Sequence, residues 1–185
     1  MIKALLLNSV LFSGEIFQYI MGMTKNDYKL DLICLKNLVI APFLEEFIYR
    51  VCMVNLMLES NSLDEVAAVL ILPLFFSLSH LHHELFVEEK RAKRLVVLRC
   101  VFKLAYTQIF GIYSGLVYIR TGSIWPAFAL HSQCNYFGFP GFGQIFNKNH
   151  RRTLRAATAA LYLFGLVFYY FSFDLVFPGS PTWWN

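Results

Sequence analysis

Apolar residues run through most of this chain in long stretches, and short polar segments separate them. A helix that crosses a bilayer needs about 20 mostly apolar residues, and fewer when it is buried inside a bundle. By this measure the sequence predicts an all-α fold, a polytopic transmembrane helix bundle of about six spans that forms a single domain over 1–185. The predicted spans are 3–22, 37–58, 66–82, 97–119, 123–138 and 156–177.

Composition agrees with a protein that lies in the membrane. The chain is 57% hydrophobic and only 15% charged, whereas soluble domains are about 45–50% apolar and about 25% charged. The net charge of +4 is small and no basic run is interleaved with aromatic residues, so we expect no nucleic-acid partner. The four cysteines form no CxxC pair, which argues against a zinc ribbon or a disulfide framework. We expect the apolar N-terminus to be a retained helix rather than a cleaved signal peptide.

Basic residues alternate between the connections that join the predicted spans. The connections 23–36, 83–96 and 139–155 are rich in Lys and Arg, whereas 59–65 and the C-terminal tail hold none and the remaining connection holds only Arg120. Because cytosolic connections carry the excess of basic residues, the three basic connections are predicted to be cytosolic. On that face they would also hold the protein near anionic membrane lipid.

Three charges interrupt the span predicted over 37–58, in the stretch "APFLEEFIYR" at 41–50. Glu46 and Arg50 are one helical turn apart and can pair on one face. The simplest interpretation of this pair is a salt bridge that stabilises the helix. Glu45 is the additional carboxylate, and an ionisable residue inside a membrane helix indicates a functional site.

Polar residues on two other predicted spans fall at the depth of Glu45. Glu45 is eight residues from the cytosolic end of its helix, which is about 12 Å at 1.5 Å per residue. His80 lies near the cytosolic end of 66–82, and His131 and Asn135 lie close to that end of 123–138. His131 and Asn135 are spaced i, i+4 and so share a helix face; Phe76 stands four residues before His80 in the same way. The predicted site therefore lies in the cytosolic half of the bilayer.

These residue types suit the hydrolysis of a peptide bond. The reaction needs a base for the attacking water and hydrogen-bond donors for the oxyanion that develops. Glu45 is the candidate base, and the side chains of Asn135 and His131 can donate N–H groups.

A zinc site is an alternative, since Glu45, His80 and His131 could supply three ligands and leave one position open. The sequence contains no HExxH motif, and "HHELFV" lacks the second histidine at the required spacing. We therefore favour a mechanism without a metal cofactor over the zinc-dependent version.

Three short motifs carry a family resemblance. "EEFIYR" fits EExxxR, "FSLSH" fits FxxxH and "HSQCN" fits HxxxN. In this order, on separate predicted spans, they resemble the type II CAAX prenyl endopeptidases, the Ras-converting enzymes among the intramembrane proteases. The stretches "SHLHHELF" and "GIYSGLVYIRTGSIWPAFALHSQCNYFGFP" are similar to the eukaryotic branch. The resemblance is close over about 36–142.

The resemblance implies an activity, a place and a set of partners. The family removes the last three residues of prenylated CAAX-box proteins, such as small GTPases, at the cytosolic face of the endoplasmic reticulum membrane. By resemblance, Glu45 and His80 match the pair that activates water, and His131 and Asn135 match the pair that stabilises the oxyanion. The other motif residues are expected to have supporting roles, namely Glu46, Arg50 and Phe76.

Two non-proteolytic functions stay open at this point. The family usually has eight spans, so the six counted here leave about two N-terminal helices of its pattern unaccounted for. A truncated, inactive isoform or a membrane scaffold would use the polar residues only to hold helices together. An ion or proton carrier would use the same buried carboxylates. Cleavage of a farnesylated CAAX peptide would distinguish the protease from both.

Overall fold

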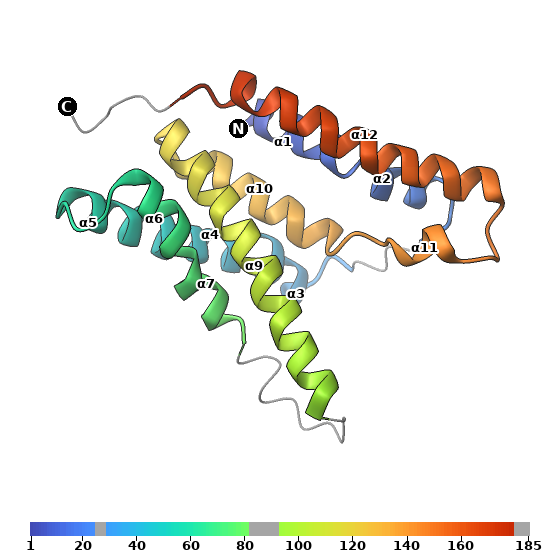
Figure 1. The fold of residues 1–185 in the computed structure, drawn as a ribbon, viewed down its shortest axis with the longest axis horizontal. Coiled ribbons are helices and arrows are strands. Elements are labelled where there is room, and N and C mark those ends of the chain that lie inside the picture. Colours follow the sequence, from blue (N-terminus) through green and yellow to red (C-terminus); the bar gives the residue numbers. More distant parts are fainter. Residues whose placement is uncertain (25–28, 82–92, 180–185) are drawn as a thin grey trace. The chain divides into compact units, whose positions relative to one another are not determined.

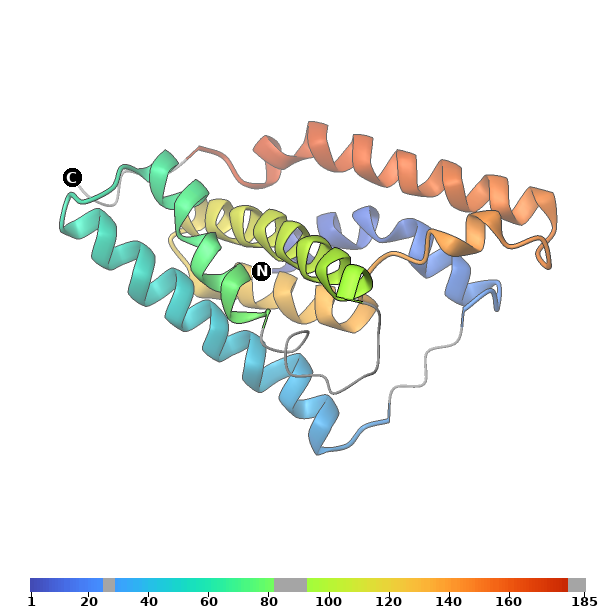
Figure 2. The same cartoon turned by 60° about the horizontal axis from the view of Figure 1, so that its bottom comes forward.

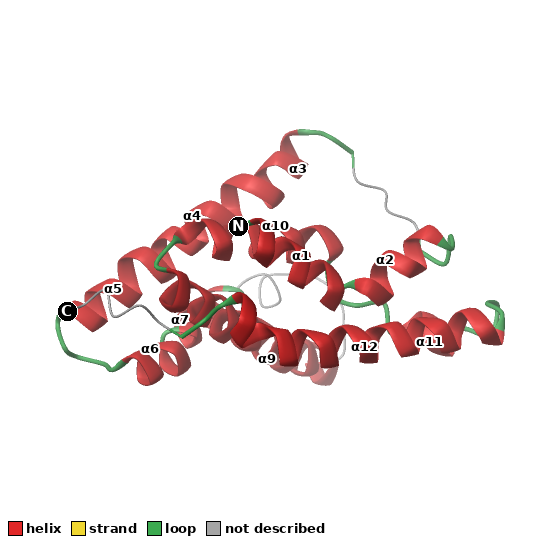
Figure 3. Cartoon of the chain, turned by 90° about the horizontal axis from the view of Figure 1, so that it is seen from above, coloured by secondary structure: helices red, strands yellow, loops and turns green. Residues whose placement is uncertain are grey.

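The computed structural model describes residues 1–24, 29–81 and 93–179. Within these residues every regular element is a helix, as the colouring of Figure 3 shows. The all-α class predicted from the sequence is therefore confirmed. Four predicted features lie partly outside the described residues: the connection 23–36, the connection 83–96, the C-terminal tail, and the span 66–82, whose last residue is not described.

The chain divides into two compact units, which are described separately. One consists of Met1–Phe43 with Phe128–Gly179, and the other includes Leu44–Ala127. Both boundaries fall inside helices, α4 (Ala41–Glu46) and α10 (Ile124–Phe137), so no linker in the sequence marks them. The single domain over 1–185 stays a prediction.

The first unit begins with two short helices where the sequence predicts one. Besides parts of α4 and α10, its helical elements are α1 (Ile2–Leu11), α2 (Ser13–Ile20), α3 (Leu32–Leu35), η1 (Lys36–Ile40), α11 (Gly143–Phe146) and α12 (Arg152–Val176) (Figure 1). Phe12, with φ −87° and ψ 15°, separates α1 from α2. Directly after this bend, the Ser13 hydroxyl donates to the Leu161 carbonyl of α12 at 2.9 Å. The bend therefore coincides with a polar contact between α2 and α12.

A glycine ends α10 and begins a loop that is tied to α2. Gly138 has φ +70°, and its N–H bonds the Cys134 carbonyl at 2.8 Å, which is the left-handed ending that glycine permits. Further along, the Gly141 N–H donates to Glu15 Oε2 at 2.9 Å, and the Tyr162 hydroxyl donates to the same oxygen at 2.5 Å. One carboxylate thus joins α2, the loop and α12.

The helix that carries the three charges begins earlier than predicted and is irregular. Asp31 caps it, because its carboxylate accepts the Cys34 N–H at 2.8 Å, as is typical of a helix start. After α3 and the π-helical segment η1 come α4, a second π-helical segment η2 (Phe47–Cys52) and α5 (Met53–Glu59). Glu45 and Glu46 therefore lie between two π-helical segments, which occur frequently at functional sites.

A proline divides the predicted span 66–82 in the second unit. It becomes α6 (Glu65–Ile71) and α7 (Pro73–Ser79), because proline has no N–H for the preceding turn. α7 lies beside α9 (Lys93–Thr121) (Figure 2). Gln108 of α9 joins the two short helices, because its amide nitrogen donates to the Leu70 carbonyl at 3.0 Å and its amide oxygen accepts from the Ser77 hydroxyl at 3.2 Å. The buried core of this unit consists of Val54, Ala68, Val69, Leu72, Tyr118, Ile119 and Ala127.

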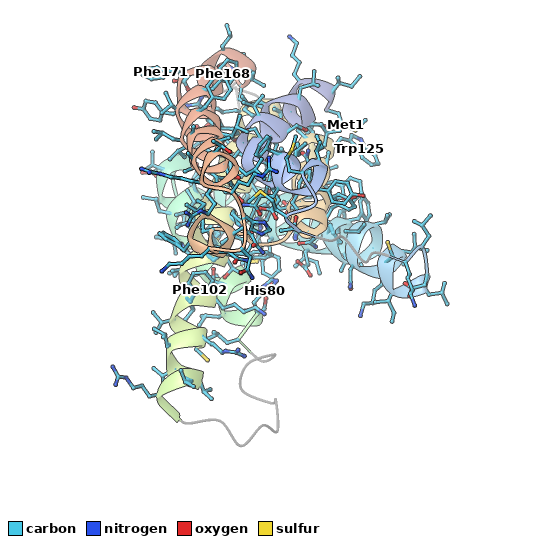
Figure 4. All side chains as sticks on the ribbon, turned by 90° about the vertical axis from the view of Figure 1, so that its right-hand side faces the viewer. Met1, His80, Phe102, Trp125, Phe168 and Phe171 are labelled. Atoms are coloured by element: carbon cyan, nitrogen blue, oxygen red, sulfur yellow. The ribbon has the colours of Figure 1, made fainter. Side chains whose placement is uncertain are left out.

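Two described helices are long and apolar enough to cross a membrane, namely Arg94–Thr121 and Arg152–Val176. Ile2–Leu11 and Glu65–Ser79 are apolar but shorter. The count of six spans stays a prediction. Many large apolar side chains are nevertheless exposed along α12, among them Phe168 and Phe171 (Figure 4), as expected of a surface that faces lipid.

Candidate active site

Glu46 and Arg50 form the ion pair that their spacing predicts. Arg50 Nε lies 3.1 Å from Glu46 Oε2, and the side chains are 2% and 0% exposed respectively. The Ser114 hydroxyl of α9 donates to the same oxygen at 2.5 Å. Breaking such a buried pair from one side is strongly destabilising, so Glu46 and Arg50 hold this helix against α9. The sequence-based reasoning missed Ser114, although its position as the one serine in the largely apolar run "GIYSGLVY" was the available signal.

Phe76 connects this ion pair with the histidine of the FxxxH motif. The Arg50 guanidinium carbon lies 5.0 Å from the centre of the Phe76 ring, a cation–π distance. The ring centres of Phe76 and His80 are 4.4 Å apart. Phe76 is buried, so it fixes the position from which His80 emerges at the end of α7 (Figure 4).

The backbone of α7 determines which nitrogen of His80 is available. His80 Nδ1 lies 2.7 Å from the Phe76 carbonyl, and because a carbonyl can only accept, Nδ1 carries the proton. In the neutral ring Nε2 is then an acceptor. Nε2 lies 3.7 Å from Glu45 Oε2, with side chains 22% and 31% exposed. The structure therefore brings the two residues of the predicted water-activating pair together, within one unit.

His131 and Asn135 lie one turn apart on the part of α10 that belongs to the other unit. His131 is buried, whereas Asn135 is exposed. The Asn135 amide nitrogen donates to the Asn37 carbonyl of η1 at 3.0 Å. The predicted oxyanion pair thus shares one helix, and η1 orients one of its two members.

Two hydrogen bonds and one pair of stacked rings hold α10 against α1 and the residue that follows it. The Asn8 amide donates to Gln133 Oε1 at 3.0 Å, and the Gln133 amide donates to the Ser9 hydroxyl at 2.8 Å. One turn further, the rings of Phe12 and Phe137 stack with centres 4.8 Å apart. Gln133 lies two residues from both His131 and Asn135, so at 100° per residue it is on the opposite side of α10. These contacts hold the back of the helix that carries the HxxxN motif, and sequence reasoning did not identify them.

Residues 1–24, 29–81 and 93–179 contain no group of three or more His, Cys, Asp or Glu side chains that could hold a metal ion. Of the three zinc ligands considered above, Glu45 and His80 lie in one unit and His131 in the other.

Fold, apolar surface and buried ion pair together place the chain among helical membrane proteins. More closely, it belongs to the type II CAAX prenyl endopeptidase family: the family model described as "Type II CAAX prenyl endopeptidase Rce1-like" matches residues 29–137. These residues include all three motifs.

Curated relatives agree with this family. The chain is 37% identical over 133 residues to "CAAX prenyl protease 2" of Homo sapiens. This match covers 70% of this chain and 39% of the human protein. It is 28% identical over 187 residues to "Probable CAAX prenyl protease 2" of Schizosaccharomyces pombe, covering 94% of this chain and 66% of the relative. It is 36% identical over 107 residues to "CAAX prenyl protease 2" of Arabidopsis thaliana, and this match covers 57% of this chain and 34% of the relative. The chain thus spans between about a third and two thirds of the length of these relatives. No solved structure matches it.

Proposed function

We propose that this chain is an intramembrane endopeptidase that removes the C-terminal tripeptide from prenylated CAAX proteins. The observation that carries the proposal is the approach of Glu45 and His80, which come from different helices, to 3.7 Å. Membership of the family supports the reaction type.

Glu45 and His80 would activate the attacking water. A water oxygen can lie about 2.8 Å from both Glu45 Oε2 and His80 Nε2. Both atoms accept hydrogen bonds, so the water would donate one proton to each and direct a lone pair at the scissile carbonyl. Glu45 would take the proton as the oxygen attacks, while His80 holds the water in place.

His131 and Asn135 would stabilise the tetrahedral intermediate. Each side chain can donate an N–H to the oxyanion, and preorganised donors in a site shielded from water lower the barrier strongly. Collapse of the intermediate breaks the C–N bond while Glu45 returns the proton to the leaving nitrogen. The prenylated cysteine then keeps the new carboxylate, and the tripeptide leaves with a free amine.

The proposal includes the setting of the reaction. The chain would cross the endoplasmic reticulum membrane about six times, with the reacting groups in the cytosolic half of the bilayer. The prenyl chain of a substrate such as a small GTPase would lie in the lipid, and the basic connections would lie near anionic headgroups.

We also propose that the reaction needs no metal cofactor. Purified, active protein should keep its rate after dialysis against a chelator and should contain no stoichiometric zinc. Loss of activity with the chelator, restored by added zinc, would favour the zinc-dependent protease instead.

The direct test uses a farnesylated CAAX peptide and the purified chain in liposomes. Glu45→Gln should lower cleavage by about 10²–10⁴-fold, because the general base is lost. Asn135→Ala should lower it by about 10²–10³-fold, because one oxyanion donor is lost. The double variant should lose less than the product of both factors, since the groups act on one transition state.

Glu59→Gln is the matched control, because it makes the same chemical change at an exposed position at the end of α5. It should cleave at the normal rate. Normal turnover by a folded Glu45→Gln protein would contradict the mechanism. A wild-type chain without any peptide product would favour the scaffold, or the carrier if ion flux appears in the same liposomes.

A further inference from the structure

The segment before the EExxxR motif departs from the α-helical pattern at one proline. At the end of η1 the Ala41 N–H bonds the Lys36 carbonyl, five residues back, as in a π-helix. The next bond of this type would join residue 42 to the Asn37 carbonyl. Residue 42 is proline, which has no N–H. Pro42 therefore leaves the Asn37 carbonyl without its donor along the helix.

The side chain of Asn135 bonds this carbonyl. Its amide nitrogen lies 3.0 Å from the Asn37 oxygen. Asn37, Pro42 and Asn135 all belong to the same compact unit, and the bond joins residues 98 positions apart. Pro42 is among the most deeply buried residues of the chain, so its ring has little room to move.

We propose that Pro42 is a positioning residue: by withholding its N–H it keeps the Asn37 carbonyl available, and this carbonyl sets the orientation of the Asn135 amide. The catalytic part of this inference rests on the proposed function of Asn135 as an oxyanion donor. An amide group is planar and carries two N–H bonds. When one is held by Asn37, the direction of the other is fixed as well. Pro42 would therefore act on the reaction only through Asn135.

Two substitutions restore the missing donor. In Pro42→Ala the ring is gone and the N–H is back, so the helix can return to the α-helical pattern, in which the Asn37 carbonyl bonds along the helix. Pro42→Val restores the same N–H with a side chain closer in volume to proline, which separates this effect from that of a cavity. Both variants should fold, since proline is the least favourable residue in a helix interior.

The first measurement does not depend on activity. With asparagine side chains labelled with ¹⁵N, the Asn135 amide signal is the one that disappears in Asn135→Ala. In Pro42→Ala and Pro42→Val its bonded proton should move upfield, because the bond to Asn37 is weakened. An unchanged signal in both variants would overturn the proposal, whether or not the protein cleaves peptides.

The second measurement is cleavage of the farnesylated peptide. Both variants should lower kcat by about three- to tenfold, the effect of one weakened hydrogen bond, with KM nearly unchanged. In an Asn135→Ala background the same substitutions should have almost no further effect, because the group through which Pro42 acts is absent. A full additional loss in that background would show a purely structural role and contradict the proposal.

Pro126→Ala is the matched control. Pro126 is also buried and lies in the first turn of α10, where a backbone N–H has no partner within the helix in any case. This variant should leave both the Asn135 signal and kcat unchanged. If wild-type protein shows no cleavage at all, the proposed function fails, and the amide signal still decides whether Pro42 orients Asn135.

Discussion

At the scale of single residues, two neighbouring carboxylates have different environments. Glu46 is completely buried, forms an ion pair with Arg50 and accepts a hydrogen bond from Ser114, whereas Glu45 is partly exposed and faces His80. The completely buried Glu46 carboxylate already contacts a cation and a hydroxyl, which leaves little room for an attacking water. The environments therefore favour Glu45 for chemistry and Glu46 for stability.

Glu46→Gln should reduce stability far more than it reduces chemistry. The neutral amide leaves the Arg50 charge buried without its anion, and losing one partner of such a pair costs about 3–5 kcal/mol. The midpoint of thermal unfolding in detergent should fall clearly, while the fraction that stays folded should still cleave peptide. Glu59→Gln, at an exposed position, should leave the midpoint unchanged. A stable but completely inactive Glu46→Gln protein would instead assign Glu46 a direct chemical role.

At the scale of elements, the position of His80 depends on how closely α7 approaches α9. A Cβ atom added to Gly111 of α9 would lie 2.6 Å from Cβ of Pro73, the first residue of α7. Proline is rigid, so it cannot move aside as a flexible side chain would. Gly111 therefore permits the close packing of the two helices, and Gln108 and Ser77 add polar contacts beside it.

Gly111→Ala should push α7 away from α9 and displace His80 from Glu45. Overpacking of this kind typically costs about 1–3 kcal/mol, and cleavage should fall as well because the water-activating pair loses its geometry. Gly115→Ala is the control one turn along α9, since an added Cβ there meets nothing within 4 Å. Stability and cleavage rate are measured for both variants. Equal behaviour of the two would show that the Pro73 contact does not position α7.

At the scale of the whole molecule, basic residues should determine orientation in the membrane. The connection 59–65 holds no basic residue, whereas 139–155 holds Lys148, Arg151, Arg152 and Arg155. Such an excess of positive charge is retained on the cytosolic side. The two connections should therefore lie on opposite sides of the bilayer.

Single-cysteine labelling in sealed microsomes tests this orientation. In a chain whose four native cysteines are replaced, Lys148→Cys should react with a membrane-impermeant maleimide added from the cytosolic side. Ser62→Cys should react only after the membrane is permeabilised. Both positions are exposed in the structure, so burial would not hide either thiol. Reaction of Ser62→Cys in intact microsomes would reverse the predicted orientation.

Local periodicity was enough to predict the helical class and the ion pair of Glu46 with Arg50, because the 3.6-residue repeat brings positions four apart together in any helix. The same repeat places His131 and Asn135 one turn apart on α10. Helix boundaries were less accurate, because the bend at Phe12 and the early start at Asp31 depend on individual side-chain contacts.

The sequence by itself determined that this chain is all-helical and strongly apolar, and which residue types it could bring to a site. Only the tertiary structure decided how the members of that site are held. Ser114 reaches Glu46 across 68 residues and Asn135 reaches Asn37 across 98. No local repeat encodes such separations, because they depend on which helices pack together and on where a proline leaves a carbonyl available.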